Sequence, residues 1–92
     1  NDLRKYFDFY NAKVYQELEF LYDSDKTYHG IIDLMLEYSD KVIIIDYKLK
    51  NINEEDYVKQ LHVYSDYVKN ITKKDVKLYL YSILEKSIKE II

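Results

Sequence analysis

The sequence predicts an α/β fold: an antiparallel three-strand meander, then a crossover helix, then a further strand parallel to the third. Three segments between residues 13 and 49 are rich in alternating or β-branched apolar residues and are separated by short polar turns. Residues 54–70 instead carry apolar residues at helical spacing and precede another strand-like segment. Because a helix between two strands implies a right-handed crossover, we expect a mixed sheet.

The first half of the chain contains the predicted meander. Residues 3–10 are expected to form a short helix. In residues 13–22, Val14, Leu18 and Phe20 share one parity, which predicts a half-buried strand with these side chains on one face. We predict the second and third strands at residues 27–38 and 41–49, joined by polar turns.

The second half contains the predicted crossover. Asn53 is predicted to be the N-cap of the helix, because acidic residues follow it in the first turn. The helix is expected to run to about Asn70, and one of its faces is apolar: Tyr57, Leu61, Tyr64 and Val68. Residues 75–83 are predicted as a fourth strand and residues 88–92 as a short fifth.

Composition indicates a single globular domain over residues 1–92, with 48% apolar and 34% charged residues. No apolar run is long enough to span a membrane, and the absence of cysteine excludes a disulfide framework or a thiolate metal site within these residues. We therefore expect a cytoplasmic protein with no membrane partner. The first residue is Asn, so we also expect the chain to be a piece of a longer protein.

The net charge of −3 limits how the chain can bind nucleic acid. Such a charge is unlike that of a module that grips DNA by electrostatics alone. A nucleic-acid role therefore requires bound cations, a local basic edge, or help from other parts of a larger protein.

Two aspartates interrupt apolar strands and need an explanation. Asp33 follows Ile31 and Ile32, and Asp46 follows the apolar run at residues 42–45. A buried carboxylate is costly unless it is paired, hydrogen-bonded or bound to a metal. Each aspartate alone is explained by a strand end that faces water, but two on adjacent strands favour a shared site. Oxygen ligands of this kind suit Mg²⁺ or Mn²⁺.

Lys48 follows Asp46 by two residues, so the two side chains should point to the same face of their strand. One interpretation is an exposed ion pair, which contributes little to stability. The other is a catalytic pair, in which the carboxylate holds a cation and the ammonium steadies the attacking water or the developing phosphate charge.

Gln60 and Gly30 also have two interpretations each. Gln60 lies one turn from Tyr57 and Tyr64, either as a boundary residue or as a hydrogen-bond donor toward a site or a phosphate. Gly30 either marks a close backbone approach within a strand or stands at the edge of a turn.

The remaining candidates are two glutamates and two histidines. Glu17 and Glu19 lie on the first strand, and a site role is slightly favoured for Glu17 over exposure to solvent. His29 and His62 are expected to have structural or solvent roles, because no histidine-ligand spacing supports either of them.

Taken in order, three short motifs resemble those of a known nuclease family. Gly30-Ile31-Ile32-Asp33, then Asp46-Tyr47-Lys48, then Gln60 and Tyr64 resemble G-x-x-D, D-Y-K and Q-x-x-x-Y. This set is similar to the RecB-type nuclease domain of the PD-(D/E)XK, or restriction-endonuclease-like, superfamily, and to AddA-like helicase–nucleases within it. Residues 15–20 resemble the family's first strand, which places a Glu at position 17.

The resemblance implies a catalytic centre with residues in named roles. Asp33 and Asp46 would be ligands of Mg²⁺ or Mn²⁺, with the backbone carbonyl of Tyr47 as a third ligand. Lys48 would be the catalytic lysine, and Glu17 would belong to the same centre. The implied fold is the PD-(D/E)XK core, a mixed sheet surrounded by helices.

The resemblance also implies a reaction and partners. Gln60 and Tyr64 would flank the site and the path of the DNA. The reaction would be hydrolysis of DNA phosphodiester bonds by an exonuclease in double-strand break repair and recombination. The partners would be DNA, helicase domains of the parent chain, and a second helicase–nuclease subunit.

The chain departs from the family pattern at one point. RecB-type nucleases usually carry a further metal-ligating His on a helix before the first strand, whereas residues 1–12 contain no His. Two alternatives to a RecB-type exonuclease also stay open. One is a non-catalytic module that keeps the fold to bind DNA or a subunit. The other is a restriction-type or CRISPR-associated nuclease of the same superfamily.

Overall fold

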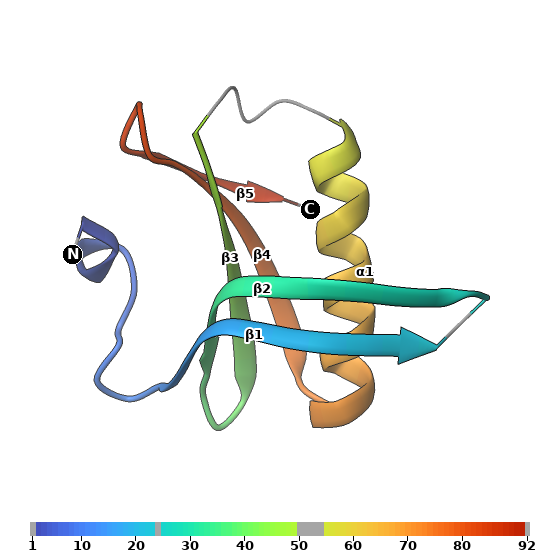
Figure 1. Ribbon diagram of the computed structural model, residues 1–92. Coiled ribbons are helices and arrows are strands. Elements are labelled where there is room, and N and C mark those ends of the chain that lie inside the picture. Colours follow the sequence, from blue (N-terminus) through green and yellow to red (C-terminus); the bar gives the residue numbers. More distant parts are fainter. Residues whose placement is uncertain (1, 24, 50–54, 92) are drawn as a thin grey trace.

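The computed structural model describes residues 2–23, 25–49 and 55–91. These residues form a mixed sheet of five strands in the order β1-β2-β3-β4-β5, with helix α1 against one face (Figure 1). The elements are η1 (Asp2–Lys5), β1 (Lys13–Asp23), β2 (Thr27–Glu37), β3 (Lys41–Lys48), α1 (Glu55–Thr72), β4 (Asp75–Ser82) and β5 (Ser87–Ile91). Neighbouring strands are antiparallel except β3 and β4, which are parallel. The predicted α/β fold class is confirmed, and the arrangement is consistent with a PD-(D/E)XK-like core.

The predicted element bounds differ from the observed ones mainly at the helices. The N-terminal helix is a single 3-10 turn over Asp2–Lys5, shorter than the helix expected at residues 3–10. Helix α1 continues past Asn70 to Thr72, and it ends there because Lys73 adopts a left-handed φ of 59°. The predicted N-cap, Asn53, lies outside the described residues. Within the described residues, no helix is both long and apolar enough to cross a membrane.

The core has two layers because β3 is buried on both faces. Val42 and Ile44 pack toward α1, whereas Ile43 and Ile45 pack toward the opposite face, on which the segment containing Leu3 lies. A strand covered on both sides reads as a continuous apolar run instead of an alternating one. The uninterrupted run before Asp46 therefore reflects the central position of β3.

Strand β1 does not keep one apolar face along its length. Leu18 and Phe20 pack toward α1 as predicted, but Val14 is 42% exposed and Tyr15 packs toward α1 in its place. The prediction that Val14 shares a face with Leu18 and Phe20 is therefore wrong. The reason is Glu17, whose φ of 52° reverses the alternation of side chains in the middle of the strand.

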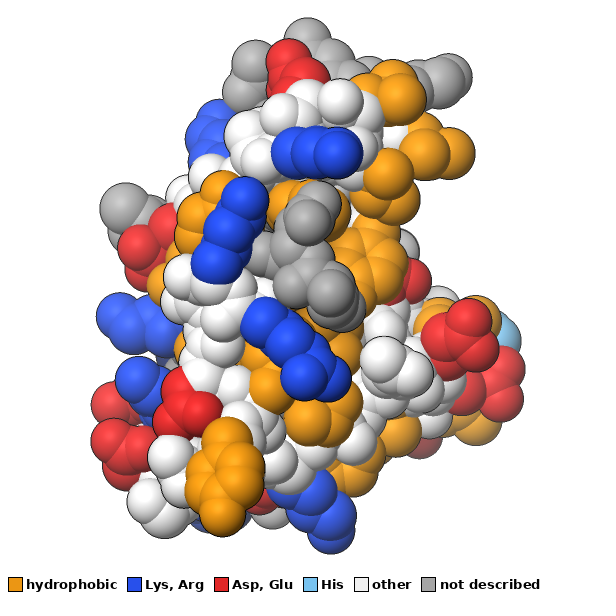
Figure 2. Space-filling model, turned by 90° about the vertical axis from the view of Figure 1, so that its left-hand side faces the viewer, with side chains coloured by type: hydrophobic (Ala, Val, Ile, Leu, Met, Phe, Trp, Pro, Cys, Tyr) orange, Lys and Arg blue, Asp and Glu red, His pale blue; other side chains and the backbone are white. Residues whose placement is uncertain are grey.

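One face of the molecule carries charges of both signs. Figure 2 shows the side on which the N-terminal segment lies, where described Lys and Arg side chains are separated from one another by apolar and acidic ones. This mixture fits the net charge of −3. On that face, the described side chains form no continuous basic surface of the kind expected for electrostatic DNA binding.

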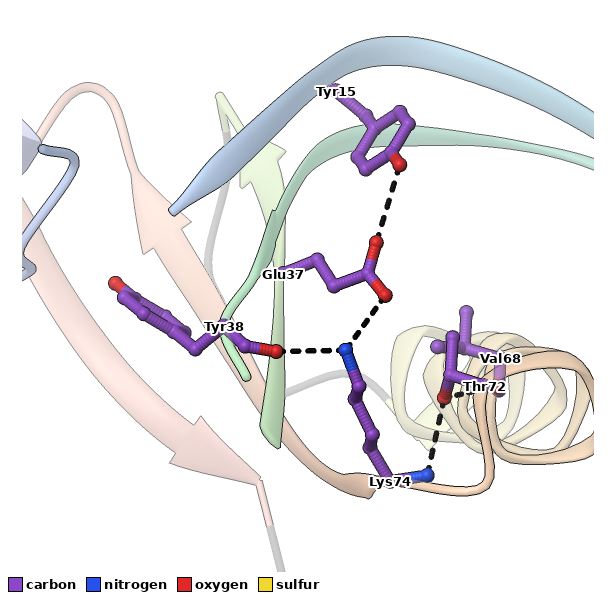
Figure 3. A network of polar contacts seen from close by, with 6 residues as sticks. All are labelled: Tyr15, Glu37, Tyr38, Val68, Thr72 and Lys74. Carbon is purple, nitrogen blue, oxygen red and sulfur yellow. Dashed lines mark hydrogen bonds and ion pairs between the residues drawn. The ribbon is translucent and has the colours of Figure 1, made fainter. Parts of the chain in front are cut away.

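A polar network fastens the start of β4 to the end of β2 (Figure 3). The Lys74 ammonium donates to Glu37 Oε2 at 2.9 Å and to the Tyr38 carbonyl at 2.8 Å. The Tyr15 hydroxyl donates to the other oxygen of Glu37 at 3.1 Å. The Lys74 hydrogen bond, followed by that of Tyr15, holds the pKa of Glu37 below its ordinary value. The network therefore links the end of the crossover to the hairpin.

Candidate active site where β2 parts from β3

Asp33 and Asp46 face each other at the point where two strands separate. The β2–β3 ladder runs from Glu37 opposite Val42 to Leu34 opposite Ile45, so the next pair in this register is Asp33 and Asp46. Beyond this point β2 pairs only with β1, as a long hairpin that extends past α1 (Figure 1). The sheet thus opens into a fork, with one carboxylate on each side of the fork. The structure thus brings the two aspartates together on neighbouring strands.

The two carboxylates occupy different environments. The backbone N–H of Tyr47 donates to Asp33 Oδ2 at 2.9 Å. Asp46 is only 4% exposed, and burial, reinforced by a hydrogen bond with Asp33, raises its pKa to about 6 even though Lys48 opposes the shift. Oδ2 of Asp46 pairs with the Lys48 ammonium at 2.8 Å. Two carboxyl groups thus stand beside one ammonium, which makes the pair an acidic centre suited to a further cation.

Lys48 is held between a carboxylate and an aromatic ring. Its side chain is 16% exposed, its ammonium lies 2.8 Å from Asp46, and it stands 3.8 Å above the centre of the Tyr57 ring. Asp46 and Lys48 do share a face, as the strand parity predicted. The burial excludes a freely exposed ion pair. The contact with Tyr57 was not foreseen, because it depends on how α1 packs over β3.

Tyr64 connects helix α1 to the two aspartates. It is buried, and Gln60 donates to its hydroxyl at 2.6 Å. Burial raises the pKa of Tyr64, and the charges of Asp46 and Asp33 raise it further. Gln60 itself is exposed at the helix surface, so its one described partner is the Tyr64 hydroxyl.

Gly30 permits this approach of the helix. A Cβ atom added at Gly30 would lie 2.8 Å from Cε1 of Tyr64 and 2.9 Å from Cε1 of Phe20. Gly30 lies within β2 and not at the edge of a turn, so of its two interpretations the close approach is confirmed. The glycine lets two aromatic rings lie directly on the hairpin beside the acidic pair.

Glu17 and the histidines lie outside the contacts of the acidic pair. Glu17 and Asp33 occupy a position that the β1–β2 pairing skips, but the Glu17 side chain is exposed. Nε2 of His29 lies 3.2 Å from Glu19, with both side chains exposed, and His62 is exposed as well.

The chemistry of the donors limits what the centre can bind. Among the described residues, no group of three or more His, Cys, Asp or Glu side chains is placed to hold a metal ion. A cation here would rest on two carboxylates and backbone oxygen. Such a set fits Mg²⁺ or Mn²⁺, because Mg²⁺ is usually held by one or two carboxylates and keeps several waters.

The known proteins that resemble this chain are much longer than it is. No family model matches it. It is 42% identical, over 91% of its length, to an ATP-dependent helicase/nuclease subunit of Clostridium beijerinckii. It is 34% identical over 71% of its length to that of Clostridioides difficile, and 32% identical over 77% to that of Clostridium botulinum strain Hall. The chain spans only 8% of the length of the first relative and 6% of the other two. It is therefore homologous to a short segment of the AddA-type subunits of ATP-dependent helicase/nucleases.

Proposed function

We propose that the chain is the core of a metal-dependent DNA nuclease that acts as an exonuclease in double-strand break repair and recombination. The observation that carries the proposal is the fork, where Asp33 and Asp46 face each other and Lys48 is paired on the same face as Asp46. The relatives are named as helicase/nuclease subunits, which supports the same activity.

In this proposal Asp33, Asp46 and the carbonyl of Tyr47 hold Mg²⁺ or Mn²⁺. When bound, such a cation lowers the pKa of a coordinated water, supplying hydroxide for attack on a phosphodiester, and offsets charge on the phosphate. Burial raises the pKa of Asp46, and the neighbouring Asp33 raises it further, so its ionised form is costly without a cation. Deprotonation of Asp46 and ion binding are therefore coupled.

Lys48 places a positive charge beside the reacting phosphate. Its ammonium already lies at Asp46 Oδ2 and over the Tyr57 ring, so little reorganisation is needed for it to stabilise negative charge that develops on phosphate oxygens. Glu17 joins the centre from across the β1–β2 ladder, and its left-handed φ at the position opposite Asp33 supports this assignment.

The remaining assignments concern substrate and partners. Gln60 and Tyr64 flank the site and the path of the DNA. Tyr64 is close to the site, because burial and then the charges of both aspartates raise its pKa. The segment would act with the helicase domains of its parent chain and with a second helicase–nuclease subunit, in the cytoplasm.

A cleavage assay tests the proposal. Linear DNA is incubated with Mg²⁺ or Mn²⁺ and either this chain or a longer form of the parent protein, each as wild type and as Asp46→Asn. We expect Asp46→Asn to slow cleavage by about 100-fold or more, because it removes a ligand that stabilises the transition state. Asp40→Asn, an exposed aspartate in the turn after β2, is the matched control and should cut like wild type. Equal cleavage rates for Asp46→Asn and wild type in the longer form would refute the proposed nuclease activity.

The second candidate is a non-catalytic module that keeps the nuclease fold to bind DNA or a partner subunit. The net charge of −3 favours it over an enzyme that binds DNA by itself. Calorimetric titration with Mn²⁺ separates the two. A nuclease should bind the ion with an affinity that falls in Asp33→Asn and Asp46→Asn, whereas a non-catalytic remnant should show no such dependence.

A further inference from the structure

An open cleft of about 580 Å³ lies between the β1–β2 hairpin and helix α1. The hairpin contributes Phe20, Lys26, Tyr28 and His29, and the helix contributes residues from Lys59 to Tyr64. This volume is within the range of roughly 300–1,000 Å³ that is usual for small-ligand sites. Its lining differs in charge from the rest of the chain.

The lining is basic although the chain is acidic. Lys26, Lys59, His29 and His62 all line the cleft, and no Asp or Glu is among the lining residues. Acidic side chains stand beside it: Glu19 contacts His29, Asp25 accepts from the Tyr28 hydroxyl, and Asp66 is close enough for its charge to act on Tyr28. An anion is therefore the complementary ligand. This is the local basic edge that a chain of net charge −3 needs to bind nucleic acid.

The cleft also offers aromatic surface. Phe20 and Tyr64 pack edge to face with their ring centres 5.2 Å apart, but both rings are buried and form only the floor of the cleft. The ring that a base can reach is that of Tyr28. Tyr28 is half-buried, and the Lys26 ammonium stands 5.3 Å above the centre of its ring. Aromatic side chains next to cations are the combination that binds unpaired nucleotides, since each base has a face for stacking.

The cleft adjoins the acidic pair through Tyr64. This residue lines the cleft and also lies close enough to Asp46 and Asp33 to be influenced by their charges. A strand that passes the fork can therefore continue into the cleft between hairpin and helix. Bases in a duplex are stacked and paired, so only an unpaired nucleotide can present its face to the Tyr28 ring.

We propose that this cleft is a subsite for one unpaired nucleotide of a DNA strand, its base against Tyr28 and its phosphate at Lys26 and Lys59. The inference rests on the proposed nuclease function for the identity of the substrate, and it adds single-stranded DNA as the form that is bound next to the carboxylates.

Binding of fluorescein-labelled dT12 to the 92-residue chain, followed by fluorescence anisotropy in EDTA, tests the electrostatic part. Lys26→Ala/Lys59→Ala should weaken binding by about tenfold and reduce the slope of log affinity against log salt by roughly 1.4, because two phosphate contacts are lost. The matched control, Lys69→Ala/Lys77→Ala, removes two exposed lysines that do not line the cleft and should change the affinity less than about twofold. Equal losses in both double variants, or no binding by wild type, would overturn the proposal.

A second pair of variants tests the base platform. Tyr28→Leu should weaken dT12 binding by about tenfold, whereas Tyr28→Phe should keep it, because the ring and not the hydroxyl provides stacking. Tyr10→Leu, at a tyrosine that is 93% exposed outside the cleft, should bind like wild type. A blunt duplex of the same length that competes as well as unlabelled dT12 would overturn the assignment to single strands.

The outcomes separate this inference from the proposed function. If cleavage by the longer form depends on Asp46 but Lys26→Ala/Lys59→Ala binds and cuts like wild type, the nuclease stands and the cleft assignment fails. If the lysine variant loses binding while cleavage does not depend on Asp46, the cleft assignment stands and the nuclease fails. Thermal unfolding followed by circular dichroism checks that each variant keeps the fold.

Discussion

Glu17 and Asp33 occupy a position that the β1–β2 pairing skips, and the alternation of side chains reverses on both strands there. On β2, Ile32 packs toward α1 whereas Leu34, two residues later, packs toward the opposite face. On β1 the reversal coincides with the left-handed φ of Glu17. The reversal falls next to the fork, so the distorted backbone and the carboxylate of Asp33 occupy the same place in the fold.

Replacing Glu17 by glycine should stabilise the protein. A left-handed φ costs an L-residue roughly 1–2 kcal/mol, and glycine adopts it without that cost. We expect Glu17→Gly to raise the free energy of unfolding by about 1 kcal/mol, measured by urea denaturation. Glu19→Gly, at an exposed neighbour of ordinary φ, is the control and should lower the same free energy by about 0.5–1 kcal/mol. A Glu17→Gly variant no more stable than Glu19→Gly would show that position 17 carries no strain.

The order of the elements was predictable because the spacing of apolar residues in each segment indicates whether it forms a strand or a helix. The alternating β1, the apolar β3 and the helical spacing of α1 are local properties, and the parallel pairing of β3 with β4 follows from the crossover. Asp46 and Lys48 could be placed on one face for the same reason, since residues two apart on a strand share a side.

Other features depend on tertiary packing and could not be predicted. Nothing in the residue type of Glu17 signals a left-handed φ, so the face of β1 on which Val14 lies was predicted wrongly. The position of Tyr57 over Lys48 depends on the distance between α1 and β3. The cleft depends on the hairpin leaving the sheet, which a strand pattern does not reveal.

Removing the Lys74 ammonium should destabilise the fold in a pH-dependent way. Lys74→Met deletes hydrogen bonds to Glu37 and Tyr38, at an expected cost of about 1–2 kcal/mol near neutral pH. Lys74 is the main cause of the lowered pKa of Glu37. The stabilisation is therefore fully present above the ordinary pKa of Glu37, 4.5, and is lost as pH falls through the lower folded-state pKa. Urea denaturation should show wild type and variant converging in acid, whereas Lys77→Met, at an exposed lysine, should match wild type throughout.

Tyr57 should position Lys48 through its ring. Because a cation over an aromatic face contributes about 0.5–2 kcal/mol, Tyr57→Leu should lower kcat of the proposed nuclease, measured in the longer form, by about tenfold and leave KM unchanged. Tyr57→Phe keeps the ring and should stay within about twofold of wild type. In NMR spectra of this chain, the ε-methylene protons of Lys48 should move downfield in Tyr57→Leu and stay shifted upfield in Tyr57→Phe. Unchanged Lys48 signals in Tyr57→Leu would mean that the contact does not form in solution.

Asp46 should make the folded state less stable as pH rises, when no divalent cation is present. Burial, followed by Asp33, raises its pKa from the ordinary 3.8 to about 6. Below pH 3.8 the carboxyl is protonated in both states, so no penalty exists. Between these values the unfolded chain releases the proton first, so the folded state loses stability until pH exceeds its own pKa. The total penalty is about 3 kcal/mol.

Asp46→Asn carries no charge and should lack this decline. Urea denaturation in EDTA between pH 4 and 7 should show wild type losing about 3 kcal/mol relative to the variant, while Asp40→Asn follows wild type. Asp46→Asn also removes the ion pair with Lys48, which shifts its free energy of unfolding by the same amount at every pH. The readout is therefore the difference between the two proteins in how that free energy changes with pH. Mg²⁺ added at pH 7 should restore stability to wild type alone. A cation bound by the two carboxylates offsets the cost of keeping the charged Asp46 buried beside Asp33. Parallel curves for Asp46→Asn and wild type would mean that Asp46 ionises as an exposed carboxyl does.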